Sequence, residues 1–190
     1  ALTRAGFRME GADLSFAMLT KAEELSREEG LRISFFQADA AALKVPHRYD
    51  FILSPNDCFN YIPPKKLPSA FAHIAKALEK DGIFWLDISS EYKLRHKVAD
   101  NISADDREDV TYLSFNSLSE DRVEMDVTLF VKRKDGSFDR FDEHHTQYIH
   151  REEDISAALR KAGFSVIRTE GHLGEPKERS DRLNLICRKQ

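Results

Sequence analysis

The stretch Gly6-Phe7-Arg8-Met9-Glu10-Gly11-Ala12-Asp13-Leu14-Ser15 decides how this chain folds. Residues 7–12 are partly apolar and predict a strand, and Ser15 is a suitable N-cap for a helix that follows at once. Asp13 would then lie at the carboxyl end of a strand, which is the edge where open α/β sheets bind ligands. Its carboxylate could accept hydrogen bonds from both hydroxyls of a ribose, or it could serve only as a helix cap.

Strand and helix patterns alternate through the first half of the chain. Strands are predicted at residues 33–37, 51–54 and 83–88, with a helix at 15–29 and a second helix that begins near Pro68 and stops at Asp81-Gly82. The apolar run at 51–54 fits a parallel strand that is covered on both faces. The alternation predicts an α/β fold built on a doubly wound parallel sheet.

An acidic residue lies at or just beyond the end of each of these strands. The four residues are Asp13, Asp39, Asp57 and Asp87. Asp is common in turns, which would explain each of them separately. Four in succession on one edge fit a ligand-binding crevice better than chance capping.

The pattern changes to alternating apolar and polar residues between 101 and 150. Strands at 110–118, 123–131 and 138–150, with a turn at Lys134-Asp135-Gly136, predict a small antiparallel sheet. We therefore divide the chain into a core, residues 1–100 and 151–190, and an antiparallel β insertion, residues 101–150, over the crevice. The core ends with a helix at 152–161 and strands at 164–170 and 182–188.

The polar segment at 143–148 belongs to the last strand of the insertion. It does not predict a metal site, because His144 and His145 point to opposite faces and His150 lies about 20 Å from His144. We expect one face of this strand to line the crevice. The alternation leaves open which face that is.

Several short motifs resemble those of class I S-adenosylmethionine-dependent methyltransferases, in the order found in that family. They are residues 9–15 with Met18-Leu19, residues 36–40, residues 49–54, and residues 78–84, in which Lys80-Asp81 replaces Pro-Gly. Residues 57–61, Asp-Cys-Phe-Asn-Tyr, are similar to a D-S-L-N-Y run of one small bacterial subgroup. The resemblance implies a Rossmann-like core and S-adenosylmethionine as the cofactor.

The resemblance also implies roles for single residues. Asp13 would hold the cofactor ribose, Asp39 would accept from the adenine amine, and Ser54 would lie near the methionine part. The full cofactor-binding set is Asp13, Leu14, Met18, Ala38, Asp39, Ala40 and Ser54. Carboxylates that accept and apolar side chains that enclose a ring suit such a ligand.

Methyl transfer needs alignment more than strong acid or base chemistry. A weak general base would suffice for an oxygen or nitrogen acceptor, and the candidates are Asp57, His144 and Tyr148. Residues 54–57, Ser-Pro-Asn-Asp, lack the second proline and the aromatic residue of amino-methylating nucleic-acid enzymes. With a formal charge of −4, this favours a small-molecule acceptor over a nucleic acid.

Composition narrows the classes of protein to which this chain could belong. The 190 residues, 41% hydrophobic, suit one well-buried core, and no apolar run has membrane-spanning length. Two distant cysteines, Cys58 and Cys187, form neither a metal motif nor a disulfide framework. We therefore expect a cytoplasmic protein without membrane contact.

The glycine-rich turn of the family is not present. It would precede Asp13 by about 20 residues, so we expect a further strand, turn and helix before Ala1. One alternative is a nicotinamide-dependent oxidoreductase, in which the same acid would hold a ribose. Another is a non-catalytic module that dimerises through its antiparallel sheet, and a homodimer is compatible with each reading.

Overall fold

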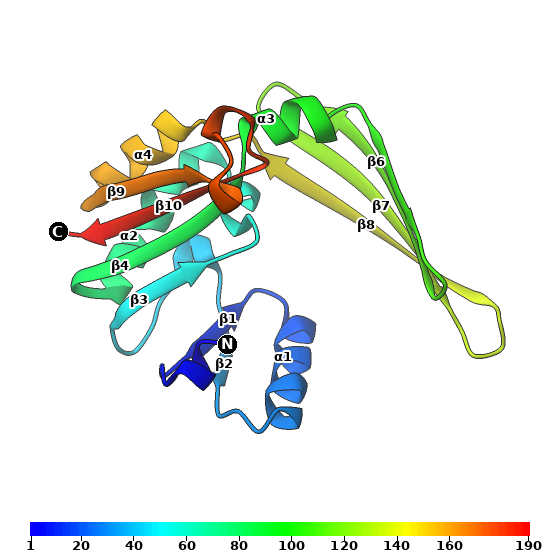
Figure 1. The fold of residues 1–190 in the computed structure, drawn as a ribbon, viewed down its shortest axis with the longest axis horizontal. Helices are drawn as coiled ribbons and strands as arrows, with labels where there is room; N and C mark the ends of the chain where they lie inside the picture. Colours follow the sequence, from blue (N-terminus) through cyan, green and yellow to red (C-terminus); the bar gives the residue numbers. More distant parts are fainter.

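The computed structural model describes residues 1–190 and contains three sheets (Figure 1). The strands are β1 (Glu10–Asp13), β2 (Ser34–Gln37), β3 (Tyr49–Ser54), β4 (Leu78–Ser89), β5 (Ile102–Asp106), β6 (Val110–Leu118), β7 (Arg122–Lys132), β8 (Phe138–Tyr148), β9 (Phe164–Gly171) and β10 (Arg182–Lys189). The helices are α1 (Phe16–Glu28), α2 (Leu67–Ala77), α3 (Glu91–Lys93) and α4 (Glu152–Lys161). Shorter turns include the 3-10 helix η3 (Cys58–Tyr61) and the π-helix η5 (Leu94–Val98).

The central sheet has the strand order β3-β4-β10-β9, with β3 parallel and β10 antiparallel to β4. Helices α2 and α4 cover one face of it (Figure 1). Phe59 packs there against Phe71 and Phe84, with ring centroids 4.9 and 5.7 Å apart. The α/β fold class predicted from the sequence is confirmed.

The parallel strands are divided between two sheets. β1 and β2 form a separate parallel pair, and no strand within residues 1–190 joins that pair to β3. Phe51 and Leu53 of β3 each keep 37% of their surface exposed, on the face that also carries Trp85. The prediction that β3 is covered on both faces is therefore wrong, because α2 and α4 cover only the opposite face.

The second predicted helix ends earlier than its sequence pattern suggests. α2 stops at Ala77, and Leu78 is already extended and pairs with Tyr49. The register against β3 then shifts before Ile83, with Asp81 at φ 62°. Asp81-Gly82 thus marks an irregularity at the start of β4, because Leu78 fits both a helical stripe and a buried strand.

The antiparallel sheet, in the order β5-β6-β7-β8, extends away from the core (Figure 1). Its first strand, β5, was not expected, because it is short and mostly exposed, and three of its five residues are Ser or Asp. Where the sheet meets the core, Val123 is fully buried with Leu94 and Ile149. None of the helices combines the length and apolar character needed to cross a membrane.

Candidate functional site

The strand-end acids converge around the thiol of Cys58, the first residue of η3. Burial raises the pKa of this thiol, and the carboxylates of Asp13, Asp57 and Asp39 raise that pKa further, while a hydrogen bond with Ser54 lowers it. The influence of a charge on a pKa falls off with distance, so all three carboxylates lie near this thiol. The carboxyl ends of β1, β2 and β3 therefore face one common region, as the sequence pattern predicts.

Asp13 and Asp39 form the exposed part of this edge. The backbone N–H of Ser15 donates to Asp13 Oδ1 at 2.8 Å, and the N–H of Ala41 donates to Asp39 Oδ1 at 2.8 Å. The second oxygen of each carboxylate has no partner in the protein. The cap and ligand interpretations of Asp13 are thus compatible, because one oxygen supports the turn and the other is free.

The residues beside these carboxylates suit a nucleoside. Leu14 and Met18 keep 66% and 61% of their surfaces exposed, which leaves apolar area available next to Asp13. The N–H of Ala38 donates to the carbonyl of Asp13 at 3.0 Å and brings the ends of β1 and β2 together. Ala40 follows directly, as the first residue of a 3-10 turn.

Asp57 is the centre of the buried part of the edge. Its backbone is left-handed, like that of Asn56, with φ values of 49° and 59°. Two such residues in succession are strained unless other contacts hold them. The Asp57 N–H donates to Asp87 Oδ1 at 2.6 Å, and the Ser89 hydroxyl donates to Asp57 Oδ2 at 2.6 Å.

Two cations complete this buried network. Arg182 donates to Asp87 Oδ1 at 3.0 Å and lies 3.8 Å from Asp57 Oδ2. Lys93 Nζ lies 4.0 Å from the same oxygen and donates to the Ser89 hydroxyl. The side chains of Asp57 and Asp87 are only 13% and 15% exposed. Their carboxylates are therefore already paired within the protein.

Asn60 ties η3 to two strands. Its Nδ2 donates to the carbonyls of Ser89 and Tyr148, at 3.1 and 3.0 Å, and its Oδ1 accepts from the Ser89 N–H at 2.9 Å. The residue is fully buried. This one amide fixes the distance between the end of β4, the end of β8 and the turn that carries Cys58.

The two faces of β8 have different surroundings. Gln147 Nε2 donates to Asp57 Oδ2 at 3.4 Å, and the His145 ring lies 6.2 Å from that of Tyr61, so this face turns toward η3. His144 and Tyr148 belong to the opposite face. The face with His145 and Gln147 is therefore the one turned toward Asp57 and η3.

His144, one of the predicted bases, lies apart from Asp57. Its ring nitrogens lie 2.8 Å from Asp126 Oδ1 and 3.2 Å from Glu124 Oε2, on an exposed surface. The hydrogen bond to Asp126 raises the pKa of His144, and the charge of Glu124 adds to this. Tyr148 is half-buried on the same face. The structure thus brings together Asp13, Asp39, Ser54 and Asp57, but not His144.

Sequence reasoning gave no role to Asn60, and it left open whether the face with His145 and Gln147 or the face with His144 and Tyr148 lines the crevice. The alternation of β8 grouped Gln147 with His145, but it carried no signal for the face that turns inward. Asn60 lies within the quoted 57–61 motif, where its type and position could have indicated a buried amide.

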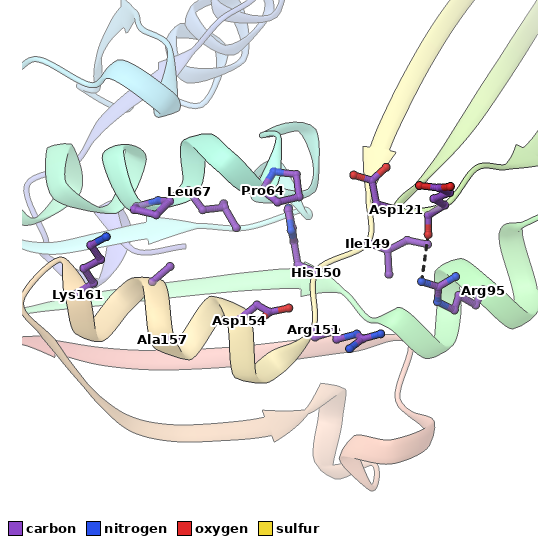
Figure 2. A pocket seen from close by; sticks show the side chains of 13 residues that line it. Pro64, Leu67, Arg95, Asp121, Ile149, His150, Arg151, Asp154, Ala157 and Lys161 are labelled. Carbon is purple, nitrogen blue, oxygen red and sulfur yellow. Dashed lines mark hydrogen bonds between the residues drawn. The ribbon is translucent and has the colours of Figure 1, made fainter.

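A cavity lies outside this edge. It measures about 620 Å³ and opens between α2, α4 and the turn before β7 (Figure 2). His150 lies in its centre, with Nε2 3.0 Å from the carbonyl of Phe59. The lining mixes both charge signs, with Arg95, Asp154 and Lys161 among it, and contains none of the strand-end acids. The candidate site is therefore identified by the chemistry of the strand ends and not by this cavity.

Comparisons with known proteins identify relatives of this chain. A family model described as a methyltransferase domain matches residues 1–82. A protein of Geobacillus sp. (strain WCH70), whose name assigns it to the methyltransferases, is 30% identical over 99% of this chain and 78% of its own length.

Solved structures give the same result. An S-adenosylmethionine-dependent methyltransferase from Clostridium acetobutylicum ATCC 824 matches with a TM-score of 0.88 and 28% identity, over 95% of this chain and 74% of that one. CalS10, an amino pentose methyltransferase from Micromonospora echinaspora, shares the fold with a TM-score of 0.71 at 18% identity, over 95% of this chain and 73% of that one.

Proposed function

The chain belongs to the class I S-adenosylmethionine-dependent methyltransferases, and on that premise we propose that it methylates a small-molecule acceptor by in-line displacement. The observation that supports this most is the pair of exposed carboxylates, Asp13 and Asp39, each with one oxygen free at a common strand-end edge. When bound, S-adenosylmethionine supplies a methyl group on an electrophilic sulfonium.

The exposed part of the edge is the proposed cofactor side. Asp13 would accept from the ribose hydroxyls and Asp39 from the adenine amine, since both carboxylates are free to accept. Leu14 and Met18 would pack against the adenine, framed by Ala38 and Ala40. Ser54, at the end of β3, would lie toward the methionine part.

The proposed acceptor side lies between η3 and β8. Asp57 is held there by Ser89 and Gln147. We therefore assign it the role of positioning the side chains beside the acceptor rather than of moving a proton. His144 faces away, which argues against its predicted role as a base. Tyr148 remains a candidate through its position at the end of β8.

A structural neighbour and the charge of the edge support a small acceptor. The amino pentose methyltransferase with the same fold acts on a small sugar. The strand-end edge of this chain carries four acids and the formal net charge is −4, whereas nucleic-acid binding relies on basic side chains that neutralise phosphates.

The test is a titration of the full-length protein with S-adenosylmethionine and, separately, with NADH, followed by calorimetry. We expect binding of S-adenosylmethionine alone. Release of S-adenosylhomocysteine with amines or alcohols, but not with DNA or RNA, would support the acceptor class. Binding of NADH alone would refute the proposal.

A further inference from the structure

Gln147 is a buried amide with a defined orientation. Only 7% of its surface is exposed, and its Nε2 donates a long hydrogen bond, 3.4 Å, to Asp57 Oδ2. A carboxylate can only accept hydrogen bonds, so the NH₂ end of the amide must be the end that faces Asp57. The carbonyl oxygen, Oε1, is therefore turned away from Asp57.

This oxygen is available to a ligand. It makes no hydrogen bond within the protein, and it is not fully enclosed. A buried acceptor without a partner costs free energy unless water or a ligand supplies a donor. Gln147 Oε1 thus presents one free acceptor on the crevice face of β8.

Neighbouring contacts fix the position of the Gln147 side chain. Asp57 is fixed by Ser89 and lies near Arg182 and Lys93, so it provides a rigid anchor. Asn60 donates to the carbonyl of Tyr148, which fixes the backbone next to Gln147. A side chain fixed in this way loses little entropy when it binds a ligand.

We propose that Gln147 determines acceptor specificity, because its Oε1 accepts a hydrogen bond from the N–H or O–H of the atom that is methylated. The inference rests on the proposed function and narrows its substrate class to amines and alcohols. Thioethers and tertiary amines have no such donor and would leave Oε1 unpaired.

The hydrogen bond would direct the acceptor's lone pair toward the methyl carbon. The lone pair forms the new bond to carbon, while the carbon–sulfur bond breaks and leaves its electron pair on sulfur. The proton of the N–H or O–H passes to water. Gln147 stays neutral throughout and acts by orientation alone.

The test uses the full-length protein, S-adenosylmethionine, and a panel of primary amines, secondary amines and alcohols, each paired with its tertiary-amine or methyl-ether analogue. Acceptor affinity by calorimetry and S-adenosylhomocysteine release are both measured. Gln147→Met keeps the side-chain length without the acceptor. We expect about a tenfold loss in kcat/KM and in acceptor affinity, with cofactor affinity and Tm unchanged.

Gln147→Glu provides a second, independent readout. Its carboxylate would repel Asp57 when ionised and could donate to it only when protonated, so we expect the pH profile of kcat/KM to move its maximum to lower pH. His144→Ala, on the opposite face of β8, is the matched control and should change neither affinity nor profile.

Three results would overturn the inference. One is an effect of Gln147→Met below twofold on both acceptor measurements, and another is equal turnover of the donor-free analogues. The third is a parallel loss of cofactor affinity and Tm, which would show a purely structural role. Absence of S-adenosylmethionine binding in the unmodified protein is a separate result, and it would refute the proposed function itself.

Discussion

Asp13 and Asp39 differ from Asp57 and Asp87 in their surroundings, although all four lie at the carboxyl ends of strands. The first two are exposed, and each uses one oxygen to cap the following turn. The other two have side chains only 13% and 15% exposed and are paired with Ser89 and Arg182. Position at the ends of strands, in two separate sheets, brings all four to one region, and burial decides what each can do there.

The difference has a simple physical origin. An exposed carboxylate oxygen can exchange its water for a ligand's hydrogen-bond donor, whereas a buried carboxylate must be paired within the protein at all times. Exposed acids at a strand end are therefore suited to bind a ligand, and buried ones are suited to hold strands and turns in place. The predictions below separate these two roles.

The largest effect is expected from the loss of the buried Asn60 amide, which ties η3 to the ends of β4 and β8. Asn60→Ala would leave the Ser89 N–H and two carbonyls without partners, and we expect a loss of about 3 kcal/mol in the free energy of unfolding. Urea denaturation measures this. Gln37→Ala is the control, since the exposed Gln37 amide donates to the carbonyl of Leu14 and its removal should cost less than about 1 kcal/mol.

A smaller loss is expected from Asp87→Asn. The substitution keeps an acceptor for the Asp57 N–H but removes the charge that pairs with Arg182, so the unfolding free energy should fall by about 2 kcal/mol. Asp13→Asn should change it by less than about 0.5 kcal/mol. Equal losses of unfolding free energy in both variants would contradict the division of the strand-end edge into a buried and an exposed part.

His150, which is also buried, provides a test that depends on pH. Burial lowers the pKa of His150, so the folded state disfavours its protonated form. The stabilising contribution is complete above the unfolded pKa of about 6.5 and is lost as the pH falls below it. Unfolding free energies of the wild type should decline more steeply than those of His150→Gln between pH 7 and pH 5. Parallel curves would show that His150 is not responsible.

The weakest effect is expected at His144. Its hydrogen bond to Asp126 raises its pKa, so any stability it provides is present below its unfolded pKa and is lost as the pH rises through the folded value. Asp126→Asn should lower the pKa of His144 in an NMR titration without changing cofactor affinity. The pair is exposed to solvent, so little change in Tm is expected. A weaker cofactor affinity would place His144 at the site after all.

The sequence was sufficient to predict the α/β class, the edge with its four acids and the antiparallel insertion, since all three follow from periodicity and turn residues. It could not predict that Phe51 and Leu53 stay exposed, because cover depends on the placement of α2 and α4. It also could not distinguish Asp13 from Asp57, or the two faces of β8, because burial at these positions results from contacts between distant segments, such as Gln147 with Asp57.

The most direct test is the affinity of full-length Asp13→Asn for S-adenosylmethionine, measured by calorimetry. The substitution keeps the cap to the Ser15 N–H and removes only the charge and the free carboxylate oxygen. A hydrogen bond to a charged group contributes about 1.5–3 kcal/mol, so affinity should fall about ten- to a hundredfold while the unfolding free energy stays the same. An unchanged affinity would contradict the assignment of the exposed acids to the cofactor.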